Sequence, residues 1–273
     1  AEAEEQYNKA LGIREKLAAD FPAVPDYRRE LAASHNHLGV LQAGLGRRAE
    51  AEEQYNKALG IREKLAADFP AVPGYRIELG GSYCNYGNMV RNGGRANESL
   101  GWFDKAIATL APVHRAEPRD VTAKEFLRNS HWGRARVHDQ LQKYAEAVKN
   151  LNRAIELSPP TEQAGFRAVR ATWRLQAGQV AEAVAEVAEL TKSPNLDANQ
   201  WYNFACFYAV ASGKIADKKQ EYADRAMQLL VKAVFKGYNN AAHIKKDTGL
   251  DRLRGRPDFK KLLAELEKKT EKK

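Results

Sequence analysis

Apolar residues recur at steps of three and four along most of the chain, and charged residues stand between them. That spacing gathers the apolar residues on one face of an α-helix. No segment alternates apolar and polar residues with period two over the length of a strand. The pattern therefore predicts an all-α fold of amphipathic helices. In the first 21 residues the apolar positions are Tyr7, Ala10, Leu11, Ile13, Leu17 and Phe21.

Proline and glycine mark where these helices end. Pro22 and Pro25 follow the first helix, and a proline lacks the backbone donor that an α-helix needs. A second helix is expected from about Tyr27 to Leu45, and Gly46 ends it. The next helix follows after this short turn, so successive helices are expected to pack as antiparallel pairs.

An internal repeat organises the helices. Residues 1–25 recur without one change at residues 49–73, a spacing of 48. Related segments begin at residues 97 and 145, and a shorter step of 36 reaches residue 181. The exact copy fits a recent natural duplication and engineering equally well. Because a helix pair can bury its apolar face only against its neighbours, we expect a right-handed superhelical solenoid.

We expect five helix pairs, an unpaired helix before them and a cap behind them. The helix at residues 1–21 would be the second member of a pair whose first member is absent. Its open face is therefore expected to meet another molecule, in a crystal or a dimer, or the helix to fray. The pairs are predicted at residues 28–68, 75–114, 121–158, 162–191 and 198–237, and the basic cap and tail at residues 238–273.

Small and large residues alternate where neighbouring helices should meet, which is how repeat interfaces pack closely. Gly39, Ala51 and Ala58 fall where a bulky side chain would force two helices apart. Gly87, Ala106, Ala147 and Ala154 take matching places in later repeats, and one larger slot holds Tyr55, Phe103, Leu151 and Val187 in turn.

Several of these residues resemble a known repeat. Leu38, Gly39, Gly46, Ala51, Tyr55 and Ala58 resemble the tetratricopeptide pattern of Leu-Gly, a turn glycine, alanine, an aromatic residue and alanine. The usual period is about 34 residues, so the 48-residue spacing is longer, as in kinesin light chain. Nearly the whole chain is similar to the C-terminal repeat arrays of planctomycete-type serine/threonine protein kinases. That resemblance implies a regulatory or recruiting arm and implies no catalysis by this chain.

In a stack of helix pairs the first helix of each pair lines the concave side. Amide side chains can donate and accept along an extended peptide, and arginine can bind a carboxylate with two parallel bonds. We therefore expect a groove for a protein or peptide; the alternative is that these residues only solvate the face or pair with nearby acidic residues. The predicted groove residues are Asn36, His37, Val40, Asn85, Asn88, Arg91, Asn129, Trp132, Arg136, Tyr202 and Asn203.

Charge adds a second candidate function. The net charge is +9, yet residues 1–192 contribute only +2 and residues 193–273 contribute +7. A basic end attracts acidic partners, so binding of a polyanion or nucleic acid is the alternative to protein binding. Nucleic acid is the less expected partner because few aromatic residues lie between the charges. The residues concerned are Arg252, Arg254, Arg256, Lys260 and Lys261.

The sequence lacks the motifs of an enzyme. It has no Gly-rich phosphate loop, no HRD and no DFG, so we expect no kinase activity and no cofactor. His131 and His138 lie seven residues apart, whereas metal sites more often place ligands four apart, so we expect no metal. Cys84 and Cys206 are expected to be buried free thiols. No apolar run approaches the roughly 18–20 residues of a membrane span, and we expect a cytoplasmic protein.

Overall fold

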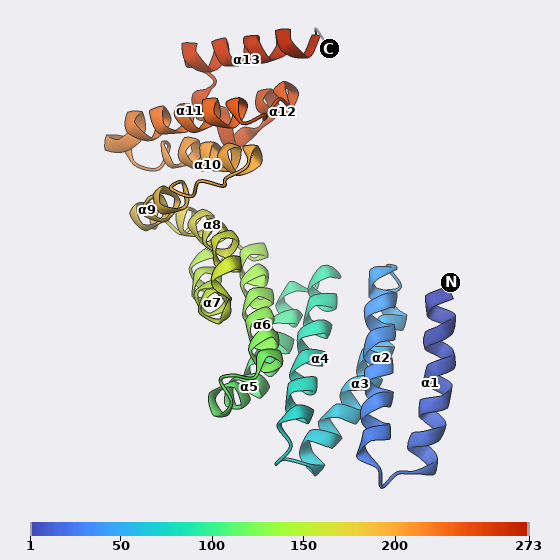
Figure 1. The fold of residues 1–273 in the computed structure, drawn as a ribbon. Coiled ribbons are helices and arrows are strands. Elements are labelled where there is room, and N and C mark those ends of the chain that lie inside the picture. The colour runs from blue at the N-terminus through green and yellow to red at the C-terminus, as the bar shows by residue number, and fades with distance from the viewer. Residues whose placement is uncertain (1, 272–273) are drawn as a thin grey trace. The chain divides into compact units, whose positions relative to one another are not determined.

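The structure is a computed structural model in which the backbone of residues 2–271 and the side chains of residues 5–268 are described. Within that range the chain is all-α and has no strand, which confirms the predicted fold class (Figure 1). Of the predicted cap and tail at residues 238–273, residues 272–273 lie outside the described backbone. The chain divides into two compact units, Ala1–Pro160 and Thr161–Lys273.

Seven helices form the described part of the first unit. The second unit contains α-helices and short 3₁₀ helices, the latter labelled η. The first unit contains α1 (Glu2–Asp20), α2 (Pro25–Gly44), α3 (Arg48–Asp68), α4 (Pro73–Asn92), α5 (Ala96–Ala116), α6 (Val121–Gln140) and α7 (Tyr144–Leu157). The second contains α8 (Pro160–Gln176), which starts at the boundary, α9 (Val180–Leu190), α10 (Ala198–Ala211), η1 (Ala216–Lys218), α11 (Lys219–Phe235), α12 (Ala241–Lys246), η2 (Thr248–Leu253) and α13 (Pro257–Glu271).

Each tight turn between paired helices needs one residue with a left-handed backbone. Gly46, Gly94 and Gly178 supply it with φ of 78°, 85° and 82°. Glycine adopts this conformation without the clash that a Cβ causes. In the turn between α6 and α7 the same place is taken by Gln142, at φ 56°. That turn therefore carries backbone strain that the other turns avoid.

The predicted alternation of small and large residues is confirmed. A Cβ on Gly39 would lie 3.3 Å from the ring of Tyr55, and one on Gly87 would lie 3.2 Å from the ring of Phe103. Gly133 of α6 also approaches the Phe103 ring, at its Cε1 and Cζ atoms. Tyr55 and Phe103 are buried, so these glycines let consecutive helices close over one aromatic side chain.

The identical sequences of α1 and α3 lie in different surroundings. Helix α3 packs between α2 and α4, and α1 packs on α2. Tyr55 and Leu59 of α3 are 2% and 4% exposed. Their counterparts Tyr7 and Leu11 in α1 are only half-buried. Burial of this segment is therefore set by its neighbours and not by its own residues.

The second unit is held by one apolar core. It joins α10 and α11 to the segment that follows them. Leu250 and Leu253 are fully buried in this core and Phe259 is 2% exposed. The leucines of the predicted cap thus pack against the last helix pair, within the same compact unit.

Candidate binding face of the first helices

The first helices α2, α4 and α6 of the N-terminal unit follow one another in a row (Figure 1). Amide side chains join two of them. Asn36 of α2 is buried, and its Oδ1 accepts a hydrogen bond from Ser82 Oγ at 3.3 Å and from Asn85 Nδ2 at 3.5 Å. Asn88 donates to the Cys84 carbonyl at 3.1 Å. The structure thus brings Asn36 and Asn85 together across two helices, whereas Asn88 bonds within its own helix.

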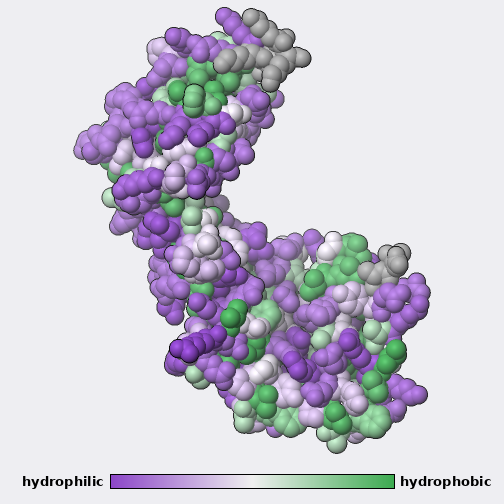
Figure 2. All heavy atoms as spheres, in the orientation of Figure 1, coloured by the Kyte–Doolittle hydropathy of each residue, from purple (hydrophilic) through white to green (hydrophobic). Residues whose placement is uncertain are grey.

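A shallow cavity of about 310 Å³ lies between α2 and α4. Val40, Asn85 and Asn88 line it, and Val40 is 47% exposed. His37 is also exposed, and its ring lies 6.3 Å from that of Tyr7. Exposed apolar residues are separate rather than continuous: Figure 2 shows hydrophobic patches scattered over a largely hydrophilic face.

The predicted residues of α6 form a cationic and aromatic group. The guanidinium carbon of Arg136 lies 5.8 Å from the centre of the Trp132 ring, a cation–π contact. Arg136 is exposed and Trp132 is half-buried. Asn129 accepts a hydrogen bond from Arg128 Nε at 3.3 Å. Trp132 therefore lies beside Arg136 with part of its side chain exposed.

Arg91 of α4 is a buried cation. It is 4% exposed, and its Nη2 donates to Asn92 Oδ1 at 3.0 Å. Its Nε and Nη1 are buried without a hydrogen-bond partner. Desolvation and the nearby charge of Arg136 lower the pKa of Arg91 to about 10. A desolvated guanidinium beside a second cation is a costly arrangement that a carboxylate would relieve.

In the second unit the structure separates the two predicted residues of α10. Asn203 is exposed, whereas Tyr202 is buried. The Tyr202 hydroxyl donates to Asp247 Oδ2 at 2.6 Å, and its ring stacks on Tyr238 at 4.1 Å. Burial and this carboxylate raise the pKa of Tyr202. Tyr202 therefore ties α10 to the cap, while Asn203 remains on the surface.

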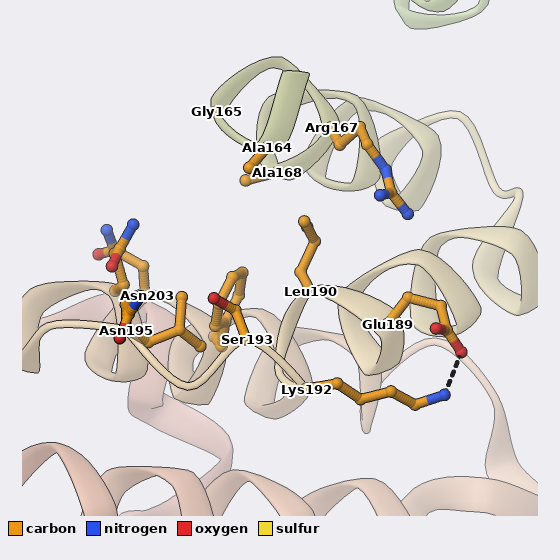
Figure 3. Close-up of a pocket in the computed structure, with 13 residues that line it drawn as sticks. Ala164, Gly165, Arg167, Ala168, Glu189, Leu190, Lys192, Ser193, Asn195 and Asn203 are labelled. Carbon is orange, nitrogen blue, oxygen red and sulfur yellow. Dashed lines mark hydrogen bonds and ion pairs between the residues drawn. The ribbon is translucent and has the colours of Figure 1, made fainter. Parts of the chain in front are cut away.

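Asn203 lies at two adjoining cavities between α8 and α10. The first, of about 510 Å³, is lined by the start of α8, the segment after α9 and the start of α10. In Figure 3, Ala164 and Ala168 of α8 face this space, with Leu190 pointing toward them. The second cavity, of about 430 Å³, shares Ala168, Asn203 and Phe204 with the first. The sequence prediction named no residue of α8. The small residues Ala164, Gly165 and Ala168 near its start were the feature that could have indicated a cavity there.

Helix α8 is joined to α9 by a buried carboxylate. Glu186 is 6% exposed. Its carboxylate oxygens accept hydrogen bonds from Arg167 Nε at 3.2 Å and from Arg174 Nη1 at 3.0 Å, and Arg170 also donates to them. Three arginines so close would repel one another without the carboxylate. The cluster fixes the two helices of this pair.

Two of the predicted basic residues of the cap are engaged within the fold. Arg254 donates to the carbonyls of Lys245 and Asp247. Arg256 pairs with Asp224 at 2.7 Å and with Asp258 at 2.8 Å. These contacts give the two arginines a structural role in fastening the cap.

Histidines and cysteines do not gather. Among residues 5–268, no three or more histidine, cysteine or acidic side chains are placed to hold a metal ion. His131 bonds Asn150 at 3.4 Å, and burial lowers the pKa of both His131 and His138. Cys84 is buried and Cys206 is half-buried, both as free thiols, and burial raises their pKa to about 11 and about 12. Neither thiol is activated as a nucleophile.

Within the described residues, no helix combines the length and the apolar character that a membrane span requires.

Comparison with known proteins agrees with this architecture. The tetratricopeptide repeat family matches residues 32–65 and 129–161. No curated protein matches the chain. Among solved structures, BtubC (BKLC) from P. vanneervenii is similar with a TM-score of 0.56 and 18% identity, over 86% of this chain and 91% of that one.

Two further structures have the same fold. YrrB, described as a TPR protein with an unusual peptide-binding site, has a TM-score of 0.53 and 19% identity, over 86% of this chain and 98% of that one. The apo form of RapI has a TM-score of 0.54 and 14% identity, over 98% of this chain and 72% of that one. At these identities the likeness shows the fold alone.

Helix pairs joined by tight turns and packed through small residues define the class as all-α helical repeat proteins. More particularly, the chain contains tetratricopeptide repeats, as the two matched stretches show.

Proposed function

We propose that the chain is a protein-interaction scaffold that binds a peptide segment along α2, α4 and α6, with an acidic group of the partner at the exposed Arg136, beside the buried Arg91. The buried guanidinium of Arg91, with two unpartnered nitrogens, carries this proposal. Folding has removed water from this cation, and the nearby charge is another cation, Arg136. A carboxylate that a partner places on the exposed Arg136 would also offset the neighbouring charge of Arg91.

The remaining features of this face suit a peptide. Val40 offers an exposed apolar contact beside the α2–α4 cavity. Trp132 and Arg136 offer an aromatic surface and a charge next to it, and such residues are frequent anchors in interfaces. YrrB, a protein of similar fold, has a peptide-binding site. A regulatory or recruiting role, as an arm of a kinase-type protein, is the corresponding proposal from the sequence resemblance.

A peptide library with and without acidic residues tests the proposal. The native chain is expected to retain peptides that contain Asp or Glu, and Arg91→Met and Arg136→Met to lose that preference. Arg153→Met is the matched control, because Arg153 is an exposed arginine of α7 that pairs with Glu156. Retention that ignores acidic content, or that survives both Arg→Met substitutions, would refute the proposal.

A measurement of stability shows whether Arg91 serves partner binding or the fold itself. If Arg91 is kept for a partner, removing its buried charge should raise the urea midpoint of the free chain, since no internal carboxylate is lost. A lower midpoint for Arg91→Met would mean that the guanidinium serves the fold instead.

A further inference from the structure

The two adjoining cavities between α8 and α10 form a mostly apolar space within the second unit. They share Ala168, Asn203 and Phe204. Their volumes of about 510 Å³ and about 430 Å³ lie in the range of pockets that hold small organic molecules, roughly 300–1,000 Å³. Leu190 and Leu196 add apolar surface to the first cavity. The apolar residues that line only the second are Val169, Leu175, Val187, Phe207 and Val210.

Arg167 brings an incompletely used guanidinium to this space. It lines the first cavity, and its side chain is 35% exposed. Its Nε donates to Glu186 Oε1 at 3.2 Å, whereas its two Nη atoms make no hydrogen bond within the part of the chain that the structure describes. Glu186 also pairs with Arg170 and Arg174, so one carboxylate offsets three cations. The planar pair of Nη groups matches the two oxygens of a further carboxylate.

The acidic side chain of the first cavity is already balanced. Glu189 pairs with Lys192 at 2.7 Å, and both side chains are largely exposed (Figure 3). An exposed pair of this kind is held weakly. Lys192 can therefore turn toward a bound anion at little cost, and the cavity keeps an excess of positive charge.

The other sides of the space give a ligand its direction. The side of the first cavity away from Arg167 carries the neutral amides of Asn195 and Asn203 (Figure 3). Asp247 lines the second cavity, and its carboxylate would repel an anionic group there. An anionic head is therefore favoured at Arg167, with the apolar body extending past Phe204.

A small molecule suits this space better than a polypeptide segment does. Nearly every residue of a peptide brings a backbone donor and an acceptor that need partners. In the second cavity the Tyr202 hydroxyl and the Cys206 thiol already donate to Asp247, at 2.6 Å and 3.5 Å. An aliphatic chain makes no such demand, and its removal from water is favourable.

We propose that the space between α8 and α10 binds a monocarboxylate with an aliphatic body. The carboxylate lies on Arg167, and the body passes Ala168 and Phe204 toward the second cavity. All of these residues belong to the second unit, so the site is independent of the peptide face on α2, α4 and α6.

Decanoate is the probe, and titration calorimetry of the full chain measures its binding. Binding at one site with a dissociation constant below about 1 mM is expected. Acetate lacks the body and decylammonium reverses the charge, so each should bind at least about tenfold more weakly. Equal binding of decanoate and decylammonium, or no binding of decanoate at about 1 mM, would overturn the proposal.

Two arginine variants locate the head group. Arg167→Met should weaken decanoate binding at least about tenfold. Arg174→Met is the matched control, because Arg174 also pairs with Glu186 and lines neither cavity. Each variant leaves Glu186 with two arginine partners, so the helix pair stays joined. In about 0.15 M salt, which screens distant charges, the control should change binding less than about twofold. Equal weakening by both variants would assign the attraction to general charge and refute the site.

A third variant tests the body of the ligand. Ala168 borders both cavities and is only half-buried, so the ring of Ala168→Phe can fill the space that the aliphatic chain needs. Decanoate binding should then be lost while the helical circular dichroism is kept. Undiminished binding to this variant would place the ligand elsewhere.

The acidic peptides of the library described above test the other occupant. Decanoate is expected to bind whether or not such a peptide is present. A peptide that is retained through Arg167, and that decanoate does not displace, would show that the space is a peptide site and would replace the proposal.

Discussion

The paired substitutions Leu17→Ala and Leu65→Ala make the same chemical change in the same local sequence. Leu17 lies in α1 and Leu65 in α3, and the surrounding residues are identical over residues 1–25 and 49–73. Helix propensity and the unfolded-state contribution of the substitution therefore cancel between the two variants. What differs is burial: Leu65 is fully buried and Leu17 is half-buried. The comparison isolates the contribution of tertiary packing.

The expected magnitudes follow from that burial. Leu→Ala at a fully buried site removes about three carbon groups from the core and leaves a cavity, which costs about 3 kcal/mol. At Leu17 roughly half of the transfer term applies, and a site open to solvent leaves no closed cavity, so about 1 kcal/mol is expected. The free energy of unfolding should therefore differ by about 2 kcal/mol between the variants.

Urea unfolding followed by circular dichroism measures the loss, and hydrogen exchange in residues 54–68 and 6–20 shows which helix is weakened. Exchange is needed because repeat arrays can lose end repeats separately. Equal losses for Leu17→Ala and Leu65→Ala would refute the reasoning, since they would mean that α1 is as well covered as α3.

Three further predictions concern the turns, the packing and the response to pH. Gln142→Gly should raise the free energy of unfolding by up to about 1 kcal/mol, because the turn at φ 56° favours glycine, and a urea midpoint that falls would contradict this. Gly133→Ala should lower it by about 1–3 kcal/mol, because the added Cβ meets the ring of Phe103, and adding Phe103→Leu to the same chain should recover part of the loss. Burial lowers the pKa of His35 and His131 in the folded chain. Below about pH 6.5 these histidines are therefore protonated more readily in the unfolded chain than in the folded chain, so the free energy of unfolding should fall as the pH falls. Replacing either histidine with Gln should reduce that slope in urea titrations, and an unchanged slope would assign the acid sensitivity to other groups.

Local sequence was sufficient for the elements and for the contacts between adjacent helices. The step of three and four predicts helices, and the turn glycines mark where pairs reverse, because only a residue without a Cβ adopts a positive φ at low cost. Gly39 and Tyr55 could be matched from sequence because the repeat places them at a helix crossing. Gln142 could not be recognised as a turn residue, since its left-handed backbone is imposed by the helices on either side.

The character of the binding face required the fold. Helical spacing placed Arg91, Asn36 and Tyr202 together on one predicted face, and it could not tell that Arg91 would be buried without an acid, that Asn36 would bond a neighbouring helix, or that Tyr202 would bind Asp247. Those facts depend on residues 45 or more positions away or on the absence of a carboxylate nearby.

The duplicated segment shows most directly which features the local sequence determines and which the tertiary structure determines. Its 25 residues determine by themselves that a helix forms and where it ends, because hydrogen bonds within a helix and the breaking effect of proline are local. The same residues leave Tyr55 buried in one copy and Tyr7 half-exposed in the other. Burial is removal from water by neighbouring surfaces, and only the tertiary structure decides which surfaces those are.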